Sequence, residues 1–209
     1  IYTFTANILD CIVVQKSNVT IDGKGYTVHG SESRVGGGVN LHYVSNVTIK
    51  NTNIDGFVHG VYLISASNNT VSGNRITNNE LQGVRLFQSS NNIICGNRVT
   101  NNNAQGIQLH LSSNNTLSGN IMSGNKYNFD VWGNELSHFI HSIDVSNLVE
   151  GKPVYYLVNE KDLVINSTTH PQVGYLALVN CTNITVEGLY SANNGQGLLL
   201  AYTNNSHII

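Results

Sequence analysis

Aromatic, imidazole, amide and charged side chains recur in this chain immediately before and after a repeated leucine. Aromatic rings can stack on the apolar faces of sugar rings, and neighbouring polar groups can bond the hydroxyl groups. If the leucines point into a core, the residues that flank them point outward together, because side chains alternate along a strand. The pattern therefore indicates a surface that could bind a carbohydrate. Its members are Asn40, His42, Tyr62, Arg85, Phe87, Gln108, His110, Asp130, Trp132 and Tyr156.

Three members of this set, Asp130, His110 and Arg85, are the weak candidates for catalysis. A histidine could act as a general base and an arginine could neutralise a uronate carboxylate, as a lyase or an epimerase requires. Glycoside hydrolysis normally uses two carboxyl groups about 5 to 9.5 Å apart, and the set contains only Asp130. A single Asp–His pair on a sheet is more often a surface ion pair. We therefore assign no catalytic residue.

The composition gives little support for a metal, a cofactor or nucleic acid. The eight histidines occupy unrelated positions and there is a single methionine, so we expect no metal site and no cofactor. A net charge of −2 provides no basic field for a phosphate backbone. No apolar run approaches the roughly 18 residues of a membrane-spanning helix, so we expect no transmembrane segment in this chain.

The leucines that organise these residues recur at a nearly constant spacing, and each is followed five residues later by an asparagine. Successive leucines are 22, 23, 23, 69 and 22 residues apart, and the long interval is three times 23. Short apolar pairs broken by Asn, Gly and Ser predict short strands separated by turns. A leucine-rich repeat would need further leucines and a return segment that favours helix. We therefore predict an all-β, single-stranded parallel β-helix. The pairs are Leu41/Asn46, Leu63/Asn68, Leu86/Asn91, Leu109/Asn114, Leu178/Asn183 and Leu200/Asn205.

Three further residues can take the leucine position in turns that lack it, namely Val13, Val131 and Leu157. Phe139 and Ile165, eight residues after the last two, are expected to point inward. This assignment predicts about nine turns in one domain over residues 1–209, a segment of a longer protein. It also predicts a short insertion around residues 31–38 and an irregular excursion near residues 133–152.

Asparagine makes up roughly 15% of the chain, and we expect most of it to be scaffold. Asn tolerates the left-handed backbone of tight turns, and stacked Asn side chains can form an amide ladder. Several Asn-X-Ser/Thr sequons coincide with the asparagine of the repeat, whereas Asn166 and Asn180 lie off it and are better candidates for glycosylation. Three cysteines, an odd number, argue against a disulfide framework.

The segments SNNTVSGN (67–74), SNNTLSGN (113–120) and SNVTIDGKGYTVHG (17–30) resemble the repeats of the NosD-like family, within the broader group called CASH domains. The segments YTFTANI and GKPVYYLVNEKDLVI are similar to large archaeal cell-surface proteins that carry this domain. The resemblance covers essentially the whole chain. It implies a right-handed coil and an exported, surface-associated protein, and it allows carbohydrate binding.

Three functions remain open from the sequence. The preferred one is a non-catalytic extracellular or cell-surface module, structural or adhesive, whose partner is a glycan or a cell-surface protein. The second is a polysaccharide-active enzyme, which could be a lyase, an epimerase or a hydrolase. The third is a self-assembling unit of a surface layer or fibre, joined end to end or laterally. The flanking residues could also be packing beneath a covering segment rather than a binding surface.

Overall fold

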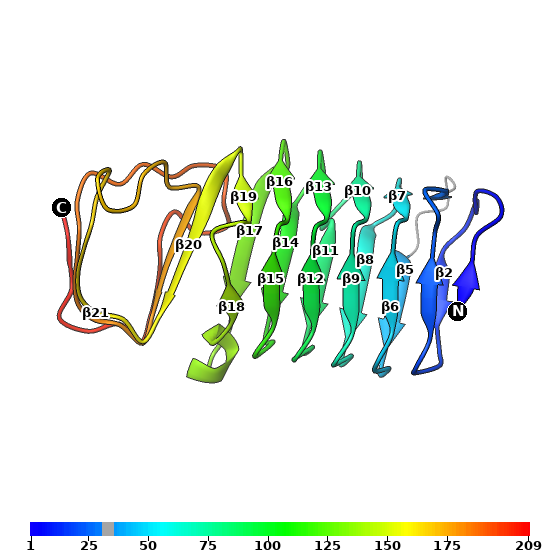
Figure 1. Cartoon of the computed structure of the whole chain (residues 1–209), viewed down its shortest axis with the longest axis horizontal. Coiled ribbons are helices and arrows are strands. Elements are labelled where there is room, and N and C mark those ends of the chain that lie inside the picture. The colour runs from blue at the N-terminus through cyan, green and yellow to red at the C-terminus, as the bar shows by residue number, and fades with distance from the viewer. Residues whose placement is uncertain (31–35) are drawn as a thin grey trace.

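The computed structural model describes residues 1–30 and 36–209 and shows an all-β coil of nine turns (Figure 1). The turns stack along the long axis of the molecule, with the N-terminus near one end and the C-terminus at the other. Six turns build three sheets, and three further turns follow with a different construction. The total of nine turns agrees with the predicted number, and the predicted fold class is confirmed.

In the first six turns, each sheet receives one short strand per turn, and the strands of successive turns pair in parallel. The first sheet contains β2 (Ile12–Val14), β5 (Gly37–His42), β8 (His59–Ile64), β11 (Val84–Phe87), β14 (Gln105–His110) and β17 (Tyr127–Trp132). The second contains β1 (Tyr2–Thr3), β3 (Thr20–Asp22), β6 (Thr48–Lys50), β9 (Thr70–Ser72), β12 (Ile93–Cys95), β15 (Thr116–Ser118) and β18 (Ser142–Ile143). The third begins with β4 (Thr27–His29), β7 (Asn53–Asp55), β10 (Arg75–Thr77), β13 (Arg98–Thr100), β16 (Ile121–Ser123) and β19 (Leu148–Val149).

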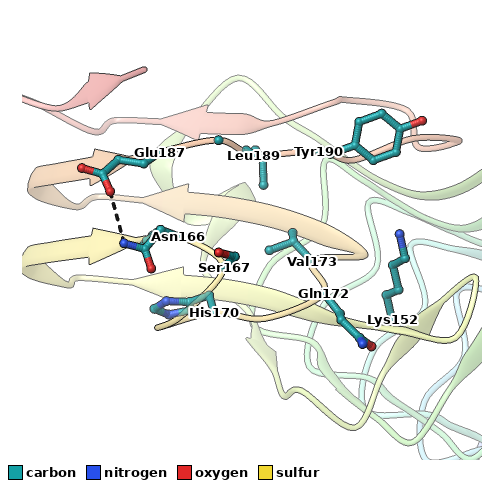
Figure 2. Close-up of a pocket in the computed structure, with 11 residues that line it drawn as sticks. Lys152, Asn166, Ser167, His170, Gln172, Val173, Glu187, Leu189 and Tyr190 are labelled. Atoms are coloured by element: carbon teal, nitrogen blue, oxygen red, sulfur yellow. Dashed lines mark hydrogen bonds between the residues drawn. The ribbon is translucent and has the colours of Figure 1, made fainter.

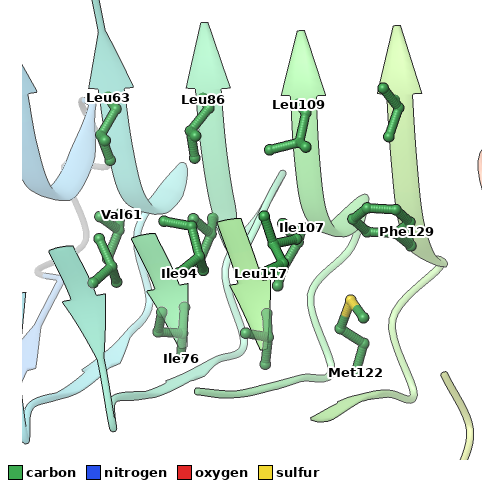
Figure 3. Packing of buried hydrophobic residues seen from close by; sticks show 14 of the residues in the cluster. Val61, Leu63, Ile76, Leu86, Ile94, Ile107, Leu109, Leu117, Met122 and Phe129 are labelled. Carbon is green, nitrogen blue, oxygen red and sulfur yellow. The ribbon is translucent and has the colours of Figure 1, made fainter. Parts of the chain in front are cut away.

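Alternation along the strands sends apolar side chains into the coil. In β11, Leu86 is fully buried, whereas its neighbours Arg85 and Phe87 face outward. Leu86 is in register with Leu63 and Leu109 on the adjacent turns, so the leucines form a column in the core (Figure 3). A single turn has no core of its own, and each turn is stabilised by burying this column against its neighbours.

The glycine three residues before the leucine is required by close packing between two sheets. A Cβ atom on Gly83 would lie 2.3 Å from Cγ1 of Val99 and 2.8 Å from Nδ2 of Asn102. A Cβ on Gly60 would lie 2.3 Å from Cγ2 of Ile76. Because the interior is already densely packed, a larger residue would displace these side chains.

Buried asparagines at the corners of the coil bond one turn to the next. Nδ2 of Asn97 donates to Oδ1 of Asn120 at 3.0 Å and to the carbonyl of Val71 at 2.9 Å, while its Oδ1 accepts from Asn74. These amides satisfy backbone groups that the corners leave outside the sheets. The asparagines five residues after the leucines instead adopt positive φ at the surface, so the main ladders are formed by other residues. The ladders contain Asn69, Asn92 and Asn115; Asn74, Asn97, Asn120 and Asn147; and Asn79, Asn102 and Asn125.

The construction changes after β19. Glu150 and Gly151, both with positive φ, reverse the chain so that β20 (Lys152–Val158) pairs antiparallel with β19. The third sheet continues through β20, β22 (Tyr175–Val179) and β24 (Leu199–Ala201), and the fourth sheet contains β21 (Lys161–Ile165), β23 (Thr182–Val186) and β25 (His207–Ile208). One face of β22 packs on the main core through Ala177, and the other packs on a second core through Leu178.

One predicted inward position, Val13, is wrong, whereas Phe139 is buried as expected but lies outside the sheet. Val13 is 51% exposed, and its neighbour Val14 takes the place in register with Leu41. Phe139 belongs to a short 3-10 helix, η1 (Leu136–Phe139), which lengthens this turn, so Ile143 pairs with Leu117 instead. The predicted irregular excursion is therefore limited to η1, which protrudes in Figure 1, because β18 and β19 continue their sheets.

The other residues assigned in the long interval between Leu109 and Leu178 have their predicted neighbours, but Leu157 lies in a different sheet from the one expected. Val131 pairs with Leu109, as predicted. Leu157 pairs with Leu178 as predicted, but in the third sheet rather than as a continuation of the first. Ile165 is buried in register with Val186. The insertion predicted around residues 31–38 lies largely outside the described residues.

Candidate functional site

The outward side of the first sheet carries a continuous row of aromatic and imidazole rings, which we call the aromatic face. The parallel register places Arg85 between Tyr62 and Gln108, and Phe87 between Ile64 and His110. The same strand alternation that buries the leucines exposes these residues. The aromatic face consists of His42, Tyr62, Arg85, Phe87, His110 and Trp132.

The rings contact one another from turn to turn. His110 lies between Phe87 and Trp132, with ring centroids 5.2 and 4.5 Å away, in edge-to-face arrangements. The Arg85 guanidinium lies 5.4 Å from the Tyr62 ring and 5.8 Å from the Phe87 ring. Such contacts hold the side chains in one arrangement. Trp132, at the end of the row, is 50% exposed and offers an accessible indole.

Arg85 is a cation without a carboxylate partner in the described part of the chain. None of the ion pairs there involves Arg85, and its Nε has no hydrogen-bond partner. A guanidinium in such a place favours a planar anion, because its N–H groups match a carboxylate in two-point geometry. The centre of the aromatic face is therefore suited to an acidic group.

The imidazoles near Arg85 are neutral at physiological pH. Burial, followed by the positive charge of Arg85, lowers the pKa of His110. The same two causes lower the pKa of His59 to about 4. His59 is 6% exposed, its ring lies 4.6 Å from that of Tyr62, and its Nδ1 has no hydrogen-bond partner. A neutral imidazole can accept a proton or a hydrogen bond.

Asp130 and Gln108 belong to a buried amide network rather than to the accessible face. Oδ2 of Asp130 accepts from Gln108 at 2.7 Å and from Gln105 at 3.4 Å, and its Oδ1 accepts from Gln196 at 2.6 Å. Both Asp130 and Gln108 are buried. Gly195 covers the carboxylate so closely that a Cβ there would lie 2.7 Å from it. This end of the predicted set is therefore covered by residues from the last turns.

Two predicted members are not part of the accessible aromatic face, because Asn40 is in register with Tyr62 but is buried, and Tyr156 lies in another sheet. Asn40 is 6% exposed, and its amide bonds both N–H and C=O of Gly37 in a local turn. Tyr156 pairs with Ala177 in the third sheet, and its buried hydroxyl donates to the carbonyl of Phe139. Its predicted place was wrong because the chain reverses before β20, which shifts the last turns to another sheet.

Sequence reasoning missed the contribution of three side chains. The ring of His59 packs against that of Tyr62 at an interplanar angle of 49°, and Gln82 extends the amide network by donating to Gln105. Their shared position before the repeat glycine was the available signal. Gln196 reaches Asp130 from 66 residues away, and no sequence pattern indicated that contact.

The two glycosylation candidates lie in the last turns. Nδ2 of Asn166 donates to Glu187, and Asn166 lines a cavity of ≈ 190 Å³ together with Lys152 and Tyr190 (Figure 2). Asn180 is exposed, adopts positive φ, and donates from Nδ2 to Asn159. In both, the atom to which a glycan would be attached already donates a hydrogen bond, and glycosylation would leave one N–H on that atom to keep this bond.

The described residues show no cluster of three or more His, Cys, Asp or Glu side chains that could hold a metal ion. The three cysteines, Cys11, Cys95 and Cys181, are free thiols. Within residues 1–30 and 36–209, no helix is long and apolar enough to cross a lipid bilayer.

Known structures share this architecture at low sequence identity. An alginate lyase from Paenibacillus sp. str. FPU-7 is 13% identical, with a TM-score of 0.53 over 98% of this chain and 89% of that one. Pectate lyase Pel9A is 14% identical, with a TM-score of 0.57 over 100% of this chain and 66% of that one. A mutant of the periplasmic alginate epimerase AlgG is 17% identical, with a TM-score of 0.48 over 99% and 46%. These likenesses show the fold alone, and the chain spans about half the length of the epimerase.

No curated protein sequence matches the chain significantly. The family model described as the right-handed beta helix region matches residues 2–143, which is more than half of the sequence. Together with the parallel register of the six turns that it covers, this match shows that the chain belongs to the right-handed β-helix family.

Proposed function

We propose that the chain is a non-catalytic surface module that binds an acidic polysaccharide along its aromatic face. The observation that carries the proposal is Arg85, a cation without a carboxylate partner among the described residues, held between the rings of Tyr62 and Phe87. Rings beside a cation provide both stacking surfaces for sugars and a site for a carboxylate. The similar structures include an alginate lyase and a pectate lyase, so alginate and pectate are the first polysaccharides to test.

The chemistry of Asp130 supports binding rather than catalysis. Three glutamine amides donate to its carboxylate, which is only 7% exposed. A general acid or base must reach the proton that it transfers. The aromatic face itself contains no carboxyl group, whereas glycoside hydrolysis normally needs two.

A lyase or epimerase is the second candidate, because one observation favours it. Burial and Arg85 keep His110 neutral, and the positive charge that could neutralise a uronate lies on the next turn. A neutral imidazole can remove the proton next to a carboxylate whose charge is neutralised. In this alternative, His110 would be the base and Arg85 would bind the carboxylate.

The proposed setting is extracellular or on a cell surface. The resemblance of segments 67–74 and 113–120 to NosD-like repeats, and of segments 2–8 and 151–165 to archaeal surface proteins, supports this setting. Asn166 and Asn180 remain our candidates for glycosylation in that environment. Self-association end to end or laterally also remains a prediction, which light scattering over a range of protein concentrations would test.

The test is retention on immobilised alginate, pectate and neutral dextran, with simultaneous measurement of new ultraviolet-absorbing or reducing ends. We expect retention on at least one acidic polymer, no cleavage, and at least about tenfold weaker retention of Arg85→Gln and Trp132→Ala. Tyr190→Ala is the matched control, because Tyr190 is 77% exposed and lies in the last turns, away from the aromatic face.

Cleavage that disappears in His110→Ala would replace the binding module with the enzyme. Equal retention of all three variants would show that the aromatic face is not the site. No retention on any polymer would leave the face as packing or as a contact for a protein.

A further inference from the structure

A second surface, at the corner between the second and third sheets, concentrates positive charge. A groove of ≈ 330 Å³ follows this corner across four successive turns. We call it the arginine groove, because Arg75 and Arg98 line it and occupy directly opposed positions on adjacent strands. Its other lining residues are Gly25, Asn51, Thr52, Asn53, Gly73, Asn74 and Gly96.

The in-register arginine pair opposes folding unless an anion is present. Paired positions on neighbouring strands bring side chains within about 4.5–5.5 Å at Cβ, where like charges are destabilising. The next partners in the row are Asn53 on one side and Ile121 on the other, and neither carries a negative charge. No ion pair or side-chain hydrogen bond of the described residues involves either guanidinium.

The amides that line the groove already have hydrogen-bond partners. Asn53 donates to the carbonyl of Gly25 at 2.6 Å, Asn51 donates to Asp22, and Asn74 bonds within its ladder. Each amide therefore uses at least one donor, whereas the two guanidiniums use none and offer most of the free donors along the groove. Each offers five N–H groups in the planar geometry that fits a sulfate or a carboxylate.

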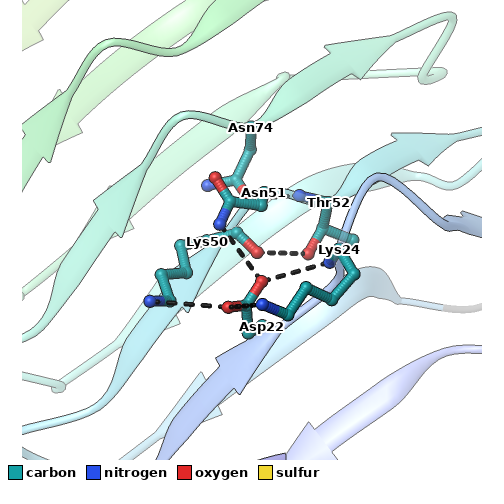
Figure 4. A network of polar contacts seen from close by, with 6 residues as sticks. All are labelled: Asp22, Lys24, Lys50, Asn51, Thr52 and Asn74. Carbon is teal, nitrogen blue, oxygen red and sulfur yellow. Dashed lines mark hydrogen bonds and ion pairs between the residues drawn. The ribbon is translucent and has the colours of Figure 1, made fainter. Parts of the chain in front are cut away.

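The surroundings of the groove hold more cations than carboxylates. Figure 4 shows Asp22 between Lys24 and Lys50, with Nζ to Oδ2 distances of 3.6 and 3.5 Å. Two lysines therefore share one carboxylate beside the two unpaired arginines. The nearby Asp55 is bonded to His29 at 2.8 Å. The corner carries a local positive surplus in a chain whose net charge is −2.

We propose that the arginine groove binds a linear anionic polysaccharide, whose sulfate or carboxylate groups lie against Arg75 and Arg98. A polymer fits because the groove runs across turns rather than into the core. A nucleic acid is disfavoured, because no aromatic side chain lines the groove and single strands are normally held by base stacking. This site is separate from the aromatic face, which belongs to the first sheet.

The test compares the wild-type chain with an Arg75→Gln/Arg98→Gln variant in titrations with dextran sulfate, polygalacturonate, neutral dextran and single-stranded DNA. The stronger of the first two ligands identifies sulfate or carboxylate as the preferred group. For that ligand we expect the variant to bind at least about tenfold more weakly and the salt dependence of log affinity to fall by about one unit per arginine. The variant should fold, since both arginines are exposed, with an equal or higher Tm at low salt.

Lys16→Gln/Lys161→Gln is the charge-matched control, because both lysines are exposed and lie outside the groove. Adding Arg85→Gln to the wild-type chain and to the arginine variant separates this proposal from the one for the aromatic face, because two separate sites predict that Arg75→Gln/Arg98→Gln weakens binding by the same factor with and without Arg85→Gln. An equal loss of affinity in the lysine control would overturn the proposal. So would tighter binding of DNA than of either polysaccharide, or no binding of any anionic polymer by the wild-type chain.

Discussion

The first six turns and the last three turns use one leucine repeat to build different interiors. In the first six, the leucines point into one core and asparagine ladders bond the corners. In the last three, β22 of the extended third sheet is buried on both faces, and Leu178 lies in a second, separate core. Cys181 and Thr203 bond the corner there, through contacts to the carbonyls of Leu157 and Leu178.

This difference shows that spacing alone does not decide which way a residue points. Leu86 and Leu178 have the same place in the repeat and are both fully buried, yet Leu86 points into the main core and Leu178 points into the second core. The antiparallel step at Glu150 and Gly151 separates the two regions, because it carries the following strands into the third sheet. The aromatic face exists only where the leucines point into the main core.

The largest expected contrast is between Leu86→Ala and Leu200→Ala. Leu86→Ala removes a fully buried side chain and should lower the free energy of unfolding by about 3 to 4 kcal/mol, including the cavity that it leaves. Leu200→Ala should cost less than about 1 kcal/mol, because half of that side chain is already in solvent. Urea denaturation of both variants measures this contrast. Similar losses would contradict the difference in burial between these two positions.

A smaller difference in stability is expected between a variant of the asparagine ladders and a variant at a corner of the last turns. Asn97→Ala leaves the buried backbone N–H of Asn74 and one of its Nδ2 hydrogens without an acceptor, and it removes one of the two donors to Oδ1 of Asn120, so we expect a loss of about 3 kcal/mol. Cys181→Ala removes only weak sulfur hydrogen bonds and little volume, and should cost about 1 kcal/mol. If urea denaturation gave the two variants equal losses, the ladders would have no special role.

The third expected effect is a loss of stability in acid that depends on His141. This residue ends one ladder: its Nδ1 accepts from the backbone N–H of Asn115, and its Nε2 contacts the carbonyl of His138. Burial lowers the pKa of His141 to about 4. As pH falls below about 6.5, the unfolded chain binds a proton that the folded chain excludes, so stability is full above that pH and declines toward pH 4.

We expect His141 to account for about 2 kcal/mol of the stability lost between about pH 7.5 and about pH 4.5. His141→Asn extends the ladder with an amide that does not titrate in this range, and it keeps every other histidine. Chemical denaturation of both proteins at the two pH values isolates the contribution. Parallel pH profiles for the wild type and His141→Asn would contradict it.

The sequence predicts the first six turns well, because burial and strand pairing both follow its period. Val131 was placed correctly from spacing alone, although it is not a leucine. Phe139 was misplaced because η1 inserts residues whose only signal is irregular composition. Val13 was misplaced by one residue because the corner after β2 is shorter than in later turns, and a shift of one residue exchanges the two sides of a strand.

The candidate site was predictable to the same extent. His42, Tyr62, Arg85, Phe87, His110 and Trp132 lie together because they follow the strand register. The sequence could not predict that Asp130 is covered, since Gln196 and Gly195 reach it only through the reversed construction of the last turns. Tyr156 was misplaced for the same reason, because its predicted position required the first sheet to continue through the last turns.

The most direct test of the central claim uses Trp132, the single tryptophan of the chain, as a reporter on the aromatic face. Intrinsic fluorescence is followed while alginate or pectate oligosaccharides are added to the wild-type protein and to Arg85→Gln. We predict a saturable change in emission for the wild type and at least about a tenfold weaker apparent affinity for Arg85→Gln. Retention of either polysaccharide without any change in Trp132 emission would contradict binding at the aromatic face.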